Sequence, residues 1–157
     1  MEFTKKIDNP QSVIINGLNA IDITNLYHYA CEYEVCIKPY PGSFDISNKN
    51  LDKFLNRYDI YLNTCAQSNR SRAKKHEYYF LYEQYVKSKA SGRDKAHHLL
   101  RHIRNSIAHG MVNMIDEKHQ ILELSDFSVN TGKDTMWAKI SVPILYQLIT
   151  KLIETKK

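Results

Sequence analysis

The segment from Arg104 to Gly110 places a permanent cation, an amide and an imidazole within two helical turns. Arginine stays protonated at any physiological pH, and histidine is the side chain that gains and loses a proton near neutrality. A guanidinium and an imidazole together can hold a phosphodiester and move a proton on it without a metal ion. Arg104 and His109 are therefore candidates for chemistry on a phosphodiester.

The pattern Arg-Asn-x-x-x-His, with four residues between Arg104 and His109, resembles the signature of the HEPN superfamily. Many members of that superfamily are metal-independent ribonucleases, and many are toxins of prokaryotic toxin–antitoxin and phage-defence systems. The specific match covers residues 101–110. Some branches continue the motif with a tyrosine two residues after the histidine, whereas this chain has Met111 at that position.

The resemblance implies an endoribonuclease that cleaves RNA by transesterification and leaves 2′,3′-cyclic phosphate ends. In that mechanism His109 exchanges a proton with the ribose 2′-hydroxyl or the leaving 5′-oxygen, and Arg104 stabilises the charge on the phosphorane. Asn105 orients a phosphate oxygen or the imidazole. The resemblance also implies an all-α fold, a homodimer in which two motif helices meet, and an antitoxin protein as a further partner.

Helical periodicity places the motif on a helix over residues 93–109, with Gly110 as its left-handed C-terminal cap. One stripe of this helix is apolar and must face the core: Ala96, Leu100, Ile103 and Ile107. The opposite stripe carries three imidazoles and an amide, with an arginine at its edge: His98, His102, Asn105, His109 and Arg101. Solvent-facing stripes usually carry Lys and Glu. We therefore expect this stripe to face a cleft or a second copy of the chain, with His98, Arg101 and His102 binding substrate.

A basic span runs from Arg70 to Arg104, with ten Lys or Arg residues and three acidic residues, although the whole chain carries a net charge of only +5. A basic middle on a near-neutral remainder indicates a surface that meets a polyanion such as RNA. The alternative is a solvated helix face whose Lys and Arg residues serve solubility.

A zinc site is a further alternative, because His98 and His102 stand four residues apart and Asp94 precedes them by one turn. No HExxH motif and no carboxylate-rich partner accompany them, so we predict neither a metal nor a cofactor. Three cysteines, without a CxxC pair, favour a reducing cytoplasm. The N-terminus lacks a signal-peptide pattern and no run of 18 apolar residues occurs, which predicts a cytoplasmic protein with no membrane partner.

Length and periodicity predict a single domain over residues 1–157, mainly α, with an antiparallel bundle of about four helices. The first helix begins near residue 20 and ends before Pro39. The second carries Leu51 to Cys65, the third carries Ser71 to Val86, and the motif helix is the fourth. Short alternating segments predict a small β appendage near 111–140, and Ser141-Val142-Pro143 opens a C-terminal helix.

Two other functions compete with the ribonuclease hypothesis. A non-catalytic HEPN-like module would bind RNA, a nucleotide or a protein through the same fold and motif. A helical adaptor would have no nucleic-acid role. A composite cleft that holds Arg104 and His109 from two chains favours the enzyme, whereas a buried, ion-paired Arg104 favours the adaptor.

Overall fold

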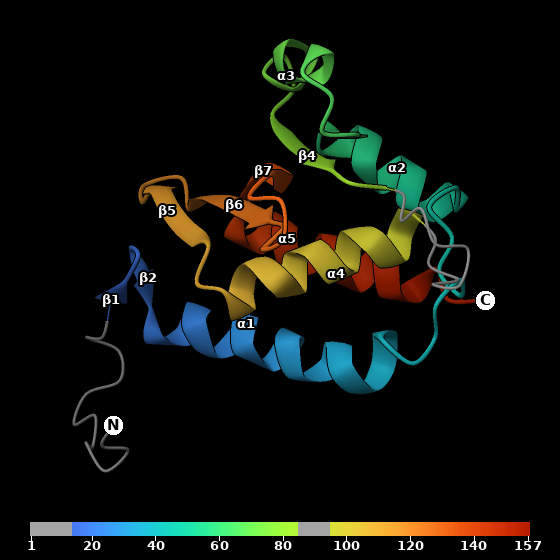
Figure 1. Ribbon diagram of the computed structural model, residues 1–157, viewed down its shortest axis with the longest axis horizontal. Helices are drawn as coiled ribbons and strands as arrows, with labels where there is room; N and C mark the ends of the chain where they lie inside the picture. The colour runs from blue at the N-terminus through green and yellow to red at the C-terminus, as the bar shows by residue number, and fades with distance from the viewer. Residues whose placement is uncertain (1–13, 85–94) are drawn as a thin grey trace.

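A mixed five-stranded sheet lies at the centre of the computed structural model, which describes residues 14–84 and 95–157 (Figure 1). Its strand order is β3-β4-β7-β6-β5. β3 and β4 run parallel, and the other neighbours are antiparallel. The strands are β3 (Ile60–Asn63), β4 (Tyr78–Tyr82), β5 (Val112–Asp116), β6 (Ile121–Phe127) and β7 (Asp134–Ser141).

The helices begin where the sequence supplies caps. Asn19 caps the first one, since its side-chain oxygen accepts the backbone N–H of Asp22 at 2.9 Å. Pro143 stands in the first turn of the last one, where its missing N–H costs no helical hydrogen bond. The described helices are α1 (Ala20–Glu32), the π-helical turn η2 (Tyr33–Ile37) that continues it, α2 (Lys49–Arg57), α3 (Ser68–Ala73), α4 (Lys95–Ala108) and α5 (Val142–Glu154). A short hairpin of β1 (Ile14–Ile15) and β2 (Leu18–Asn19) precedes them.

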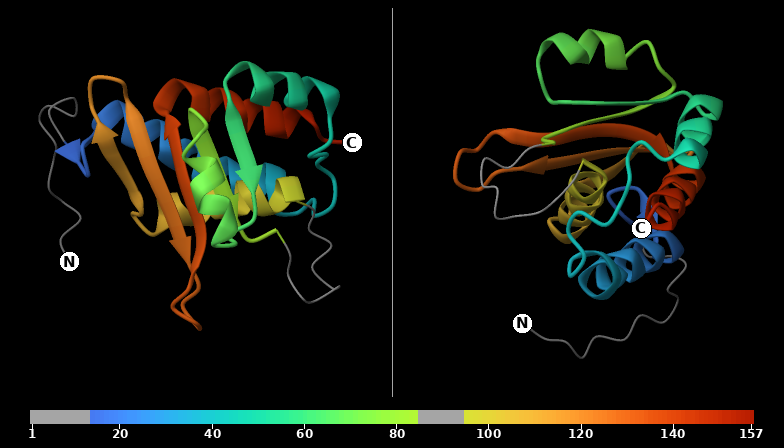
Figure 2. Two further views of the ribbon diagram at one scale, coloured as in Figure 1. Left: turned by 90° about the horizontal axis from the view of Figure 1, so that it is seen from above. Right: turned by 90° about the vertical axis from the view of Figure 1, so that its right-hand side faces the viewer.

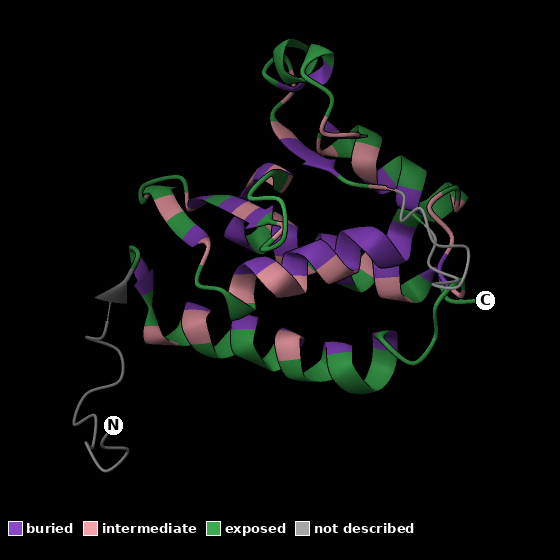
Figure 3. Ribbon diagram, in the orientation of Figure 1, coloured by how far each residue is buried: buried purple, intermediate pink, exposed green. Residues whose placement is uncertain are grey.

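Helix α4 lies between the sheet and α1, so it has protein on both sides (Figures 1 and 2). The Tyr29 hydroxyl on α1 donates to the carbonyl of Leu100 at 2.6 Å and ties the two helices together. α5 packs beside α4 and against β7, whereas α3 packs on the other face of the sheet. As Figure 3 shows, α4 is buried almost all round in its N-terminal half and becomes accessible towards its C-terminal end.

The predicted mainly α bundle with a small β appendage is wrong, because the strands near 111–140 belong to the central five-stranded sheet, which replaces part of the bundle. The third predicted helix contains β4, whose side chains alternate between two cores. Phe80 and Tyr82 point into the main core, and Tyr79 and Leu81 pack in a second cluster with Trp137. Because both faces are covered, the strand shows a continuous apolar run that periodicity cannot distinguish from a buried helix.

The second predicted helix is correct in its first half only. α2 ends at Arg57, Asp59 takes a left-handed conformation with φ of 52°, and Ile60–Asn63 then pairs with β4. The helix near residue 20, the motif helix, the alternating strands and the C-terminal helix are confirmed. Tyr85, Val86 and the Ser91-Gly92 break lie outside the described residues. Within the described ranges, no helix is long and apolar enough to cross a membrane.

Candidate active site

The motif occupies the exposed end of α4, where the chain turns away towards β5. The turn is fixed by two hydrogen bonds, from Gly110 N to the carbonyl of Ile107 at 3.1 Å and from Met111 N to the carbonyl of Ser106 at 2.7 Å. Gly110 has φ of 67°, the left-handed conformation that such a helix ending requires. The predicted glycine cap is thus confirmed, and it leaves the His109 side chain 44% exposed.

Asp126, at the end of β6, is the centre of the site. Its carboxylate accepts from His102 Nδ1 at 2.8 Å, from Asn105 Nδ2 at 3.2 Å and from the Phe127 backbone N–H at 2.9 Å. His109 Nδ1 lies 3.8 Å from Oδ1 of the same carboxylate, within ion-pair range. A buried carboxylate therefore lies beside two histidines of α4.

Asn105 connects this carboxylate to Arg104. The amide oxygen of Asn105 accepts from Arg104 Nη1 at 3.0 Å, while its amide nitrogen donates to Asp126. Arg104 and His109 point in different directions around the helix, as their spacing predicts. The structure links them indirectly, through the contacts Arg104–Asn105, Asn105–Asp126 and Asp126–His109.

Arg104 is ion-paired and partly accessible. Its Nη2 donates to Glu34 Oε1 at 2.7 Å, and its guanidinium lies 5.7 Å from the centre of the Tyr33 ring. The Arg104 and Glu34 side chains are 32% and 40% exposed. A hydrogen bond from Lys38 lowers the pKa of the Glu34 carboxyl first, with a smaller contribution from Arg104. The helical-adaptor hypothesis predicts that Arg104 forms a buried ion pair, whereas the observed Arg104–Glu34 pair is partly exposed.

His98 and His102 lie on the stripe that we expected to face a cleft or a partner, and His102 lines the polar pocket described below, but both residues are almost fully buried. Each of these residues is 1% exposed, because the stripe packs against the chain's own sheet. His102 Nε2 lies 3.1 Å from the carbonyl oxygen of Glu83. Arg101 Nη2 lies 3.3 Å from His98 Nδ1 and 3.2 Å from His102 Nε2. Asn105, His109 and part of Arg101 reach the surface.

A polar pocket of about 210 Å³ opens beside the motif. Its walls come from α4, from the ends of β4 and β6, and from the start of β7. The lining residues are Glu83, Arg101, His102, Asn105, Asp126, Phe127, Ser128 and Thr135. Phe127 also approaches His109, with ring centres 6.1 Å apart. The pocket and the motif therefore share the Asn105–Asp126 wall.

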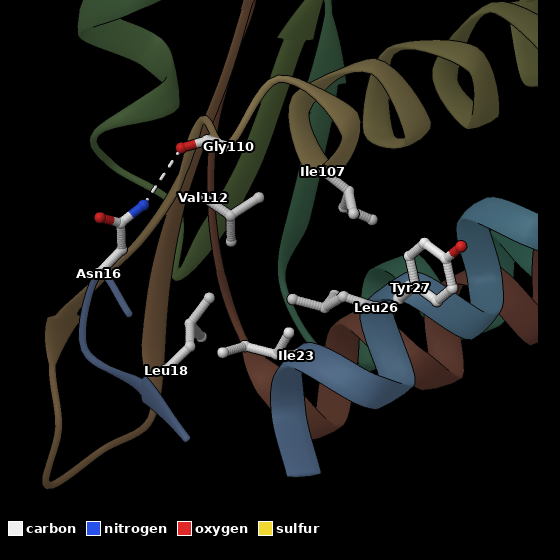
Figure 4. Close-up of a pocket in the computed structure, with 8 residues that line it drawn as sticks. All are labelled: Asn16, Leu18, Ile23, Leu26, Tyr27, Ile107, Gly110 and Val112. Carbon is white, nitrogen blue, oxygen red and sulfur yellow. Dashed lines mark hydrogen bonds between the residues drawn. The ribbon is translucent and has the colours of Figure 1, made fainter. Parts of the chain in front are cut away.

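A second pocket of about 210 Å³ lies between the β1–β2 hairpin, α1 and the end of α4 (Figure 4). Its described lining is uncharged and largely apolar: Asn16, Leu18, Ile23, Leu26, Tyr27, Ile107, Gly110 and Val112. It lacks the acid, base and cation of the motif, so we place the candidate chemistry at the polar pocket.

The described residues contain no group of three His, Cys, Asp or Glu side chains arranged to hold a metal ion. Asp94, the third member of the zinc alternative, lies outside them. His98 and His102 are instead engaged with Arg101, and His102 with Asp126.

Sequence reasoning did not identify Asp126 or Glu34. Asp126 follows Leu122 and Leu124 on the inward face of β6, and all three are buried. A carboxylate at an inward position of an alternating strand needs buried donors. That signal is readable from the sequence. Glu34 gives no comparable signal, because its contact with Arg104 joins residues from two separate helical segments.

Replacing Asp126 with asparagine is expected to lower the free energy of unfolding by about 1–3 kcal/mol, because the charge is lost and one of the two buried acceptor oxygens becomes an NH2 donor. Burial raises the pKa of Asp126, but hydrogen bonds from His102 and Asn105 outweigh it and hold this pKa below the usual range. The ionised carboxylate therefore stabilises the fold above the unfolded-state pKa, and this contribution is lost as pH falls through the lower folded-state pKa. Urea unfolding at pH 5 and pH 3 measures this: the difference in the free energy of unfolding between parent and variant should be smaller at pH 3. A constant gap would contradict it.

Comparison with known proteins identifies one family. A family model described as HEPN pEK499 p136 matches residues 23–156. The match spans most of the chain and includes the motif, which confirms the resemblance predicted from Arg104, Asn105 and His109. No curated protein and no solved structure matches the chain significantly.

Proposed function

Because the chain belongs to the HEPN pEK499 p136 family, we propose that it is a metal-independent endoribonuclease that cleaves RNA by transesterification. The observation that carries this proposal is the continuous set of contacts Arg104–Asn105–Asp126–His109 at the exposed end of α4. It assembles a cation, an amide and an imidazole backed by a carboxylate, which are the groups that the chemistry needs.

In the proposed reaction the ribose 2′-oxygen attacks the adjacent phosphorus and the bond to the 5′-oxygen breaks. His109 has Nδ1 near Asp126, so Nε2 is the nitrogen that takes the 2′-hydroxyl proton or supplies the proton that the 5′-oxygen needs. The Arg104 guanidinium stabilises the charge on the phosphorane oxygens. Asn105 holds the guanidinium in place through its amide oxygen.

A homodimer through the motif helix remains part of the proposal. Its surface is the C-terminal end of α4, where Ala108 and His109 are exposed and Arg104 and Asn105 are partly so. His98 and His102 are not in this surface, because they pack on the sheet. In a two-fold pair, one His109 could take the proton of the 2′-hydroxyl while the second protonates the leaving oxygen.

The superfamily also supports the wider proposal of a prokaryotic toxin or phage-defence effector in the cytoplasm, controlled by an antitoxin protein.

A non-catalytic RNA-binding module is the second candidate, because Glu34 already engages Arg104. The described cations of the basic span are divided between the two sides of the sheet. Arg70 and Arg72 stand on α3, across the sheet from Arg101 and Arg104 on α4. Lys87, Lys89 and Arg93 lie outside the described residues.

The proposal predicts that the purified chain cuts single-stranded RNA in excess EDTA and leaves 2′,3′-cyclic phosphate ends. A DNA strand of the same sequence should stay intact, because it lacks the 2′-hydroxyl. Gel analysis of end-labelled RNA and DNA strands measures the cleavage of each. Phosphatase treatment of the products tests for the cyclic phosphate end. If the chain never cuts RNA but binds it with an affinity that falls steeply with salt, as phosphate contacts require, the result supports the non-catalytic RNA-binding module and contradicts the ribonuclease proposal.

A further inference from the structure

We propose that the polar pocket beside the motif binds one unpaired nucleobase, next to the phosphate that is cleaved. This inference rests on the proposed function, since it assigns a base-binding site to the same RNA substrate. The position of the pocket is the first argument. Asn105 and Asp126 form its wall and also belong to the motif contacts. A group bound there lies against Asp126, whose Oδ1 is 3.8 Å from His109 Nδ1.

The ring of Phe127 is the second argument. It is a large apolar side chain, 38% exposed, at the edge of a pocket whose other side chains are polar. Its centre lies 6.1 Å from the His109 ring, with the two planes 44° apart. Proteins that recognise single-stranded RNA commonly stack an unpaired base on such an aromatic ring. Phe127 can thus carry a base and keep the attached ribose near His109.

The polar lining is the third argument. Glu83 and Asp126 offer acceptors, Arg101 offers donors, and the Ser128 and Thr135 hydroxyls can do either. The edge of a nucleobase combines donors and acceptors in the same way. An anion such as phosphate fits less well, because two carboxylates and one guanidinium line this pocket. The volume of about 210 Å³ is below the roughly 300–1,000 Å³ of sites for drug-sized ligands and suits a single ring system.

The walls of the pocket are held by backbone contacts, so its shape does not depend on a bound ligand. Glu83 N donates to the carbonyl of Thr135 at 2.8 Å and joins the end of β4 to β7. Ser128 N donates to the carbonyl of Lys133 at 2.9 Å and closes the β6–β7 turn. A site built on fixed walls selects between bases by hydrogen bonding, so the enzyme should prefer one base beside the cleaved bond.

The test replaces Phe127 with alanine and measures the cleavage of short single-stranded RNAs that vary at the bases flanking the cut. Loss of stacking should raise KM about tenfold with a smaller change in kcat, and Phe127→Trp should restore the parent value. Thr135→Val should change the preferred base without abolishing cleavage. Val129→Ala is the matched control, since Val129 is 80% exposed and does not line the pocket. Unchanged KM and unchanged base preference in both pocket variants would overturn the inference.

Binding measurements separate this inference from the proposed function. The probes are the four ribonucleoside 3′-monophosphates and an unlabelled oligonucleotide, titrated against the parent and Phe127→Ala by NMR. A shift of the Thr135 signal that is larger for one base than for the others in the parent, and that is lost in Phe127→Ala, supports the base site even if no RNA is cut. If the parent cuts RNA and both pocket variants cut it with the same KM and base preference, the ribonuclease proposal stands and the base site is rejected. Absence of any base-dependent shift in the parent would also remove it.

Discussion

Replacing His109 with alanine is expected to slow RNA cleavage by roughly 10²–10⁴, the usual contribution of a general acid or base. His109 Nδ1 lies beside the Asp126 carboxylate, and the side chain is 44% exposed at the end of α4. It is therefore oriented by the protein and accessible to substrate. Single-turnover cleavage of one RNA by parent and variant at equal protein concentration measures the loss.

His119→Ala is the control for this experiment. His119 also lies on the surface and contacts a carboxylate, that of Asp116 at 2.8 Å, but it stands on the β5–β6 turn, which contributes nothing to the motif site. Its removal should leave cleavage unchanged. Both variants should melt close to the parent, since both side chains are exposed. Cleavage by His109→Ala at the parent rate would show that the proton is moved by another group.

Replacing Arg104 with alanine is expected to slow cleavage by roughly 10²–10³, the loss that follows removal of one group stabilising an oxyanion. The variant loses the only cation bonded to Asn105 in the part of the chain that the structure describes. Arg104→Lys should recover part of the rate, because an ammonium supplies charge without the two-pronged geometry of a guanidinium. The same single-turnover assay measures both.

The Glu34→Gln variant tests whether Arg104 acts in catalysis or only stabilises the fold. If the Arg104–Glu34 pair is structural, removing either partner should lower both the melting temperature and the cleavage rate to a similar extent. If Arg104 meets the phosphate, Glu34→Gln should keep the parent rate while Arg104→Ala does not. Arg57→Ala is the matched control, since Arg57 also lies over a tyrosine ring, that of Tyr58 at 5.3 Å, away from the motif.

The sequence predicts the helix that carries the Arg104–His109 motif better than it predicts the surroundings of that helix. The apolar stripe of Ala96, Leu100 and Ile103 is fully buried, and Gly110 ends the helix in the left-handed conformation. Both features are local, because periodicity and backbone conformation depend on neighbouring residues. The segments at 112–141 were likewise recognisable as strands, because one face of each carries apolar residues at every second position.

The errors concern contacts between distant segments. A polar stripe on a helix has the same pattern whether it meets water, a partner or a buried carboxylate, so His102 could not be assigned to Asp126 by spacing. The tyrosine-rich run at 78–82 has protein on both faces, which removes the alternation that marks a strand. The sheet that overturns the expected mainly α bundle depends on this strand, through its pairing with β3 and β7.

The order of the strands along the chain determines when the contacts of the motif can form during synthesis. Asp126 bonds to Asn105 and lies near His109, and it leaves the ribosome after both of these motif residues. The central strand β7 follows later still, and its Trp137 pairs with Leu81 on β4. A nascent chain that already contains Arg104 and His109 therefore still lacks the carboxylate and the central strand that hold them. If the chain is the ribonuclease proposed above, we expect no RNA cleavage by the unfinished chain until β6 and β7 have been translated.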